Sequence, residues 1–349
     1  MISLQIADSI DKIDAQEWNS LSAELPFQSH AWYAFGERVM KDCKPVYLLA
    51  YQDKKLIARG SFWATPNEPL PQYAGAWRVI LKPILRRWPL LICRSPLSYA
   101  TGIILPEDTV ARKEVIALLV DAALAHGRER GCSFLLFDYL GKDIKYILPK
   151  NLWSMEMPGP GTVMRNIWQD FDNYLAHGNK KDRQHYKRTV REAKKLDIEI
   201  RRHVHAKSID EILPLVRNVE AQHGAPVNPW TIDMVQNMEM IKGTFLTATM
   251  NDQLVGCGLL LEDNNAQMAG ALGLSKDVPY VYLMLIYEGI KVALENKVGL
   301  LRWGSGAYDV KRRLGFELED NSVSAFMPIH PFFQKISKWY NELTGNKQP

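Results

Sequence analysis

The sequence has few cysteines, and they are not paired. Cys43, Cys93, Cys132 and Cys257 are scattered over 349 residues, and no two of them form a C-x-x-C motif. This distribution argues against a zinc site and gives no sign of a disulfide framework. No uncharged run reaches the ~18 apolar residues that a membrane-spanning helix needs. We therefore expect neither a metal site nor a membrane span.

The N-terminal residues also lack the pattern of a signal peptide. Asp8, Asp11 and Asp14 lie where a basic start and an apolar run are required. Hydrophobic residues make up 47% of the chain and charged residues 23%, which excludes a wholly disordered protein. At roughly 150 residues per domain, the length predicts about two domains. We expect a two-domain cytoplasmic protein.

The chain contains an internal repeat. Residues 45–62 (PVYLLAYQDKKLIARGSF) align without a gap with residues 244–261 (TFLTATMNDQLVGCGLLL) at an offset of 198. Each segment reads as two β-strands around a polar turn, which predicts a β-hairpin. A helical pattern precedes each hairpin, and a long helix and a short apolar strand follow it. The sequence therefore predicts two copies of one module.

The order helix, hairpin, helix, strand is typical of an α/β or α+β module with a mixed sheet. We place the two modules at residues 1–160 and 161–349. Aligning Phe137 with Trp303 lowers the offset from 198 to 166, so the first module carries 32 extra residues. They fall within residues 69–106.

This insertion at residues 69–106 has no aspartate or glutamate. A basic, tryptophan-bearing amphipathic helix suits an anionic membrane surface. The alternative is a core-packed insertion with a solvated basic edge, and Pro83 argues against a long helix. The residues on which both interpretations rest are Trp77, Arg78, Lys82, Arg86, Arg87, Trp88 and Arg94.

The strongest local signal is a basic helix predicted at about residues 170–196. Residues 180–195 hold eight Lys or Arg and two acids, a net charge of +6 against +4 for the whole chain. Helical spacing places these cations on one face, where they would attract RNA, a nucleotide-linked precursor or an anionic lipid headgroup. The alternative is a solvated charged face. The candidate substrate-binding residues are Lys180, Lys181, Arg183, Lys187, Arg188 and Arg191.

Two motifs give the chain a resemblance to a known family. The first is W-x-x-F-x-x-Y-L followed by K-K-x-R-x-x-x-K-R and A-K-K, running from Trp168 to Lys195. The second is GSGAYDVKRRLGF, from Gly304 to Phe316. Together they resemble the FemABX peptidyltransferases and also the related BioF2-like acyltransferases, which these motifs do not separate.

This resemblance implies tandem GNAT-like (acyltransferase) modules and acyl transfer to an amine. FemABX enzymes move an amino acid from aminoacyl-tRNA to a peptidoglycan precursor. The resemblance thus implies an aminoacyl-tRNA or acyl-CoA donor, no tightly bound cofactor and an anionic cell-envelope acceptor at the inner face of the membrane. The chain shows no coiled-coil arm between the modules, which some members of the family use. It also has Arg302 where relatives often carry an acidic residue.

The candidate catalytic residues follow from the chemistry of aminolysis. Lys311 could stabilise a developing oxyanion, and Tyr308 could relay a proton; a solvent-facing Lys311 is the alternative. Glu220 and His223 share a helix face and could orient or deprotonate the amine, although His223 would also suit a helix C-terminus. In the second motif, the candidate substrate-binding glycines are Gly304 and Gly306.

Two rival functions remain. An acetyl-CoA-dependent N-acyltransferase of polysaccharide biosynthesis would need a Q/R-x-x-G-x-G/A loop before a helix. The nearest match, Gln267-x-x-Gly270-x-x-Gly273, has the wrong spacing and falls on an expected strand. The second rival is a non-catalytic RNA- or membrane-binding protein with a degenerate fold.

Overall fold

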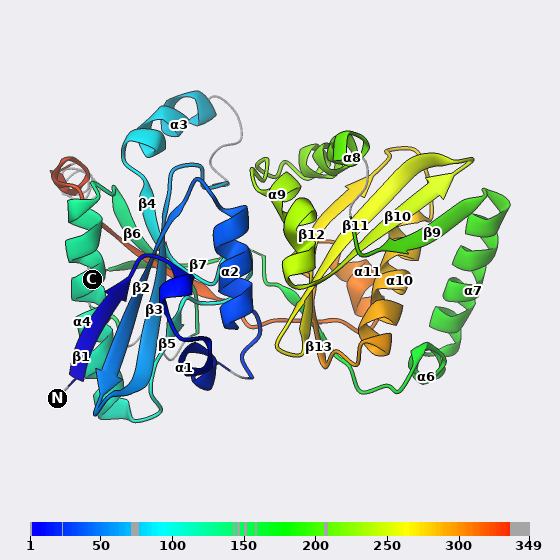
Figure 1. Ribbon diagram of the computed structural model, residues 1–349. Coiled ribbons are helices and arrows are strands. Elements are labelled where there is room, and N and C mark those ends of the chain that lie inside the picture. Colours follow the sequence, from blue (N-terminus) through cyan, green and yellow to red (C-terminus); the bar gives the residue numbers. More distant parts are fainter. Residues whose placement is uncertain are drawn as a thin grey trace. The chain divides into compact units, whose positions relative to one another are not determined.

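The structure is a computed structural model. It describes residues 2–22, 24–70, 77–141, 144, 147–149, 152–157, 159–205 and 209–335, with the backbone alone at residues 77–81 and 109. The side chains of Trp77 and Arg78 therefore lie outside the described residues. The chain forms two compact units, Met1–Pro158 with Asn321–Pro349 and Gly159–Asp320. Figure 1 shows the elements of each unit.

The first unit is built around a mixed sheet with the strand order β1-β2-β3-β4-β6-β15-β7, and β5 pairs with β3. Apolar side chains of α4 pack on one face of this sheet and form the main core of the unit. The elements are β1 (Ile2–Ala7), η1 (Ile10–Lys12), α1 (Ala15–Ser20), α2 (His30–Val39), β2 (Lys44–Gln52), β3 (Lys55–Thr65), α3 (Trp77–Arg87), β4 (Leu90–Cys93), β5 (Ile103–Ile104), α4 (Thr109–Glu129), β6 (Phe134–Leu140), β7 (Trp153–Glu156) and β15 (Val323–Pro328).

The second unit has a mixed sheet with the order β14-β8-β13-β12-β11-β10-β9. Helix α10 packs on one face, because Gly256 on β11 lies against Val281 and Leu285; Cys257 faces the other side, towards α8. The elements are β8 (Thr162–Arg165), α6 (Phe171–His177), α7 (Lys180–Lys195), β9 (Ile198–His203), α8 (Ile209–Gln222), α9 (Thr231–Asn237), η3 (Met238–Met240), β10 (Lys242–Met250), β11 (Gln253–Asp263), β12 (Ala266–Leu274), α10 (Val281–Glu295), β13 (Leu300–Arg302), α11 (Tyr308–Arg313) and β14 (Glu317–Leu318).

The two hairpins match residue by residue. Ala50 pairs with Ala58, and Ala248 pairs with Gly256, at the predicted offset of 198. A register shift follows Ala50 in one hairpin and Ala248 in the other. Both turns hold two consecutive residues with positive φ, as a tight hairpin with a right-handed twist requires. The strand registers therefore support the predicted duplication.

The extra residues of the first module separate β3 from β4. In the second unit β11 and β12 are joined by the turn Asn264–Asn265, whereas α3 lies between β3 and β4. Helix α3 is followed by β4, which pairs antiparallel with β3 and parallel with β6. Strand β12 makes the same two kinds of pairing with β11 and β13. The insertion thus adds a helix without changing the order of the equivalent strands.

The end of the chain differs from the predicted boundary. The sequence placed residues 161–349 in the second module, but β15 pairs with β6 and β7 in the first sheet. Conversely, β8 follows β7 in the chain and yet pairs with β13 in the second sheet. The two units have therefore exchanged the strand that lies beside β6 or β13.

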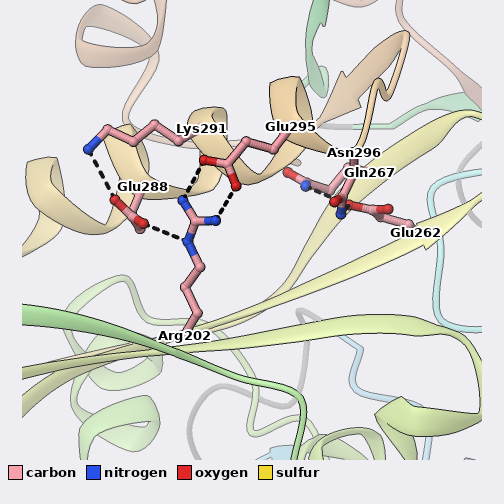
Figure 2. Close-up of polar contacts among 7 residues, drawn as sticks. All are labelled: Arg202, Glu262, Gln267, Glu288, Lys291, Glu295 and Asn296. Atoms are coloured by element: carbon pink, nitrogen blue, oxygen red, sulfur yellow. Dashed lines mark hydrogen bonds and ion pairs between the residues drawn. The ribbon is translucent and has the colours of Figure 1, made fainter. Parts of the chain in front are cut away.

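Ion pairs anchor α10 over the edge of the second sheet. Arg202 on β9 contacts the carboxylates of Glu288 and Glu295 on α10, and Figure 2 shows its guanidinium between them. At the end of the helix, the Asn296 amide donates to Glu262 over 2.9 Å, and the Gln267 amide donates to the same oxygen over 3.1 Å. These contacts fix α10 relative to β9, β11 and β12, and hence one wall of the candidate site.

Candidate active site

The predicted basic helix consists of two helices. The sequence predicted one helix at about residues 170–196, but α6 ends at His177 and α7 begins at Lys180. Asn179 and Asp182 form a capping box that starts α7. Arg183 donates to the carbonyls of Gly178 and Ala176 and so caps α6. The break turns the beginning of α7 towards a pocket.

This pocket, which we call the α7–α11 pocket, has a volume of about 960 Å³ and lies within the second unit. Helix α7 contributes Lys181, and α11 contributes Arg312 and Arg313. His177, Asp182, Arg183 and His185 add further polar groups. The aromatic residues of the lining are Trp168, Tyr174, Tyr280, Tyr282 and Tyr287. Cations and aromatic rings thus surround one concave site.

Two polar side chains in the lining are notable. The Trp168 indole N–H is buried and has no hydrogen-bond acceptor among the described residues. An unsatisfied buried donor of this kind costs about 1–3 kcal/mol. The pKa of His185 is lowered, first by burial and then by Arg188 and Arg313. Two arginines therefore lie near His185, and the Asp182 carboxylate opposes their effect on its pKa.

Lys311 is buried rather than solvent-facing, with 6% of its surface exposed. Its Nζ donates to the carbonyl of Trp303 over 2.5 Å and to that of Gly304 over 3.2 Å. An ammonium has three N–H donors, so these contacts leave one N–H for another acceptor. Burial lowers the pKa of Lys311 to about 8. The side chain is thus a desolvated ammonium at the end of β13.

Backbone geometry holds this strand end in place. The Gly304 carbonyl accepts hydrogen bonds from the Thr162 amide over 3.0 Å and from the Thr162 hydroxyl over 2.8 Å, in addition to the Lys311 contact. Gly304, Gly306 and Ala307 have φ values of 59°, 91° and 48°. The left-handed region favours glycine, which explains the two glycines of the motif.

The other predicted catalytic residues have different surroundings. The Tyr308 hydroxyl donates to the Pro160 carbonyl over 3.0 Å and so ties α11 to the start of β8. Glu220 accepts from Arg217 over 2.5 Å and from the Asn228 amide over 3.0 Å. His223 is exposed beyond the end of α8. The expected Glu220–His223 pair is absent among the described residues, because α8 ends before His223 and Arg217 holds the carboxylate.

The candidate substrate-binding residues divide into two groups. Lys181 and Arg183 line the α7–α11 pocket. Lys180, Lys187 and Arg188 are exposed on α7 outside the pocket lining, and Arg191 contacts Glu192. Arg312 and Arg313 also line the pocket and were not among the residues predicted from the sequence. Their position next to Lys311, on a short helix that begins after two glycines, is the signal that could have identified them.

The glycine pattern of the acetyl-CoA rival has a structural role. Gln267, Gly270 and Gly273 all lie on β12, as the sequence predicted. Gln267 is fully buried and bonds to Glu262 and Trp303. A Cβ on Gly273 would lie 2.9 Å from the Cβ of Leu215, so this glycine allows α8 to pack closely.

The described ranges contain no group of three or more His, Cys, Asp or Glu that could hold a metal ion. Nor do they include a helix long and apolar enough to cross a membrane.

The first unit has larger side chains at two positions that are glycines in the second unit. The sheet registers place Arg94 where the second unit has Gly270, and Asp138 where it has Gly304. Arg94 makes a two-pronged ion pair with Glu68, each contact 2.6 Å long. Asp138 accepts from the Ser324 hydroxyl over 2.7 Å. All four side chains are buried.

The fold has clear structural relatives. FemX matches 95% of this chain and 99% of its own, with a TM-score of 0.62 and 11% identity. A tandem GNAT protein from the clavulanic acid biosynthesis pathway gives the same coverage with a TM-score of 0.58 and 10% identity. At these identities the likeness shows the fold, and the predicted tandem GNAT fold is confirmed.

The family is established by sequence. Residues 9–347 match the family model FemAB-like, described as peptidoglycan biosynthesis/recognition. The chain therefore belongs to the FemAB-like family, and the predicted enzyme class, an acyltransferase of cell-envelope biosynthesis, is confirmed. A comparison with curated protein sequences found no match.

Proposed function

We propose that the enzyme transfers an aminoacyl group from aminoacyl-tRNA to an amine of an anionic cell-envelope precursor. The observation that carries this proposal is the α7–α11 pocket, where cations and aromatic rings line one cavity. Phosphates pair with lysine and arginine, and nucleobases stack on aromatic side chains. The 3′ end of a tRNA offers both groups. A ligand oxygen would also satisfy the Trp168 N–H.

The reaction needs stabilisation of negative charge. The neutral acceptor amine attacks the ester carbonyl, the ester C–O bond breaks, and the amine proton passes to the departing ribose oxygen. Lys311 is not part of the pocket lining, so the ester would have to reach the end of β13, where the remaining N–H of Lys311 would donate to the oxyanion that develops between these steps. The carbonyls of Trp303 and Gly304 hold the ammonium in place.

The chain before α10 favours this donor over acetyl-CoA. Residues 275–280 read SKDVPY and contain no glycine. The N-cap residue Tyr280 makes no side-chain capping bond and has a φ of 69°. A phosphate cradle at a helix N-terminus usually uses a glycine-rich loop, which is missing here. This segment is therefore poorly suited to the pyrophosphate of a coenzyme A thioester.

Donor binding tests the proposal. We expect aminoacyl-tRNA to bind, with an affinity that falls steeply as salt rises, because phosphate contacts release counterions. The variant Arg312→Glu/Arg313→Glu should lose at least about tenfold in affinity and show a shallower salt slope. Lys187→Glu/Arg191→Glu is the matched control, with the same charge change outside the pocket lining. Acetyl-CoA binding without tRNA binding, or equal losses in both variants, would contradict the assignment.

A further inference from the structure

A basic and aromatic surface lies on the first unit, outside the sites described above. Two segments far apart in the sequence form it: the end of α3 and residues 330–335. We call it the α3 patch, and it consists of Lys82, Arg86, Arg87, Trp88, Phe332 and Lys335.

Aromatic contacts join the two segments. The Trp88 ring stacks on Phe332, with centroids 6.2 Å apart and an interplanar angle of 17°. Phe333 meets Trp88 edge-on at 5.9 Å and also packs on Phe134 of β6 at 5.3 Å. Leu85 is buried beneath α3 with Leu90 and Ile92. The patch is thus held on the sheet as a formed surface.

The outer side of the patch is positively charged and partly apolar. Lys82, Arg86, Arg87 and Lys335 are exposed, and none of them forms an ion pair with a described residue. Phe332 leaves 52% of its surface exposed. Glu68, which directly precedes the insertion, is buried against Arg94. The patch therefore presents cations around an exposed phenyl ring.

We propose that the α3 patch docks the first unit on an anionic membrane surface. Lipid headgroups of negative charge attract such cations, and aromatic side chains favour the membrane–water interface. RNA is a weaker match, because base stacking needs an open ring face. Phe332 stacks on Trp88, and the Arg87 guanidinium lies 5.6 Å from the same ring. The second unit has a tight turn in place of α3, so the surface is confined to the first unit.

Vesicle cosedimentation tests this inference with the full chain. We expect binding to vesicles that contain phosphatidylglycerol and little binding to pure phosphatidylcholine. The variant Arg86→Glu/Arg87→Glu should bind at least about tenfold more weakly, since each cation near the surface contributes to the attraction. Phe332→Ser should weaken binding by a smaller factor.

The matched control is Lys54→Glu/Lys113→Glu, which makes the same charge change on exposed residues of the same unit. Lys54 lies in the β2–β3 turn, at the other end of β3 from the segment that leads to α3 (Figure 1). We expect this control to retain binding within about threefold, because only cations near the lipid surface contribute strongly.

Three results would overturn the inference. The first is equal binding of wild type and the Arg86→Glu/Arg87→Glu variant. The second is a loss of tRNA affinity in that variant with vesicle binding intact, which would assign the patch to RNA. The third is a change of oligomeric state in the Phe332→Ser variant, seen by light scattering, which would assign the patch to a second copy of the chain.

Discussion

The two units share one strand order but differ at equivalent positions of their central strands. At equivalent positions in or just after the central parallel strands, the second unit has Gly270 and Gly304, and the first has Arg94 and Asp138. Glycine leaves the backbone accessible, so Thr162 and Lys311 reach the Gly304 carbonyl. In the first unit a buried ion pair fills the same region. The same arrangement of strands thus leaves backbone groups accessible in the second unit and covers them with side chains in the first.

This difference supports assigning the chemistry to the second unit. Lys311 and the α7–α11 pocket lie on elements of that unit. The Arg94–Glu68 pair depends on Glu68, which precedes the insertion that only the first unit carries. Four experiments test this difference between the two units.

The largest effect is expected from Glu68→Gln in the first unit. The substitution removes the two-pronged carboxylate partner of the buried Arg94 guanidinium. Breaking a buried ion pair typically costs 3–5 kcal/mol, so we expect about that loss in the free energy of unfolding. Urea denaturation measures it. The double variant Glu68→Gln/Arg94→Met should recover much of the loss, and aminoacyl transfer per folded molecule should be retained. An unchanged midpoint for the single variant would contradict the importance of the pair.

Lys311→Met should be the most damaging change to activity. It removes the ammonium and keeps a chain of similar length, so we expect kcat to fall about 10²–10³-fold, the usual effect of losing one oxyanion donor. The control in the first unit is Asp138→Asn, at the position equivalent to Gly304, which should leave kcat nearly unchanged. Similar losses in both variants would place the chemistry in both units.

The pH dependence gives a more specific signature of Lys311. Burial lowers its pKa to about 8, so transfer that needs the ammonium should decline as the pH rises through about 8. Lys311→Met should lack this limb of the profile. Folding stability should instead rise with pH, because Lys311 binds its proton more tightly in the unfolded chain than in the folded protein. The contribution of Lys311 to the free energy of unfolding therefore increases as the pH rises above about 8.

The smallest effect is expected from Gly304→Ala. A β-carbon in the left-handed region costs roughly 1–2 kcal/mol, and Gly304 has a φ of 59°. Thermal unfolding measures the loss. Gly258→Ala is the matched control on β11, where a new Cβ would meet no atom within 4 Å. If the two variants lose equal stability, the backbone of Gly304 is not the reason for its glycine.

Local patterns made much of the fold predictable. The repeated hairpins and the helices around them follow from alternation and helical spacing, and the 166 offset agrees with the registers of β6 and β13. The strand exchange was not predictable in this way. Strand β15 is a short apolar segment, and nothing in its sequence distinguishes pairing with β6 from pairing with a strand of the second unit.

The site was predictable in part for the same reason. Asn179 and Asp182 form a capping box that is visible in the sequence, so the break between α6 and α7 could have been identified. The partners of Glu220 could not have been identified from the sequence. Its contact with the Asn228 amide depends on how the chain turns after α8, and tertiary contacts of this kind leave no periodic signal.

The exchanged strands also determine when the first sheet can be completed during synthesis on the ribosome. Strand β15 lies between β6 and β7 in the first sheet but is encoded after all of the second unit. The first unit must therefore wait until the whole of the second unit has been synthesised, whereas the second unit already has every strand of its sheet by then. In a nascent or truncated chain that ends before β15, the edges of β6 and β7 that normally pair with β15 are exposed. Unpaired strand edges of this kind promote aggregation.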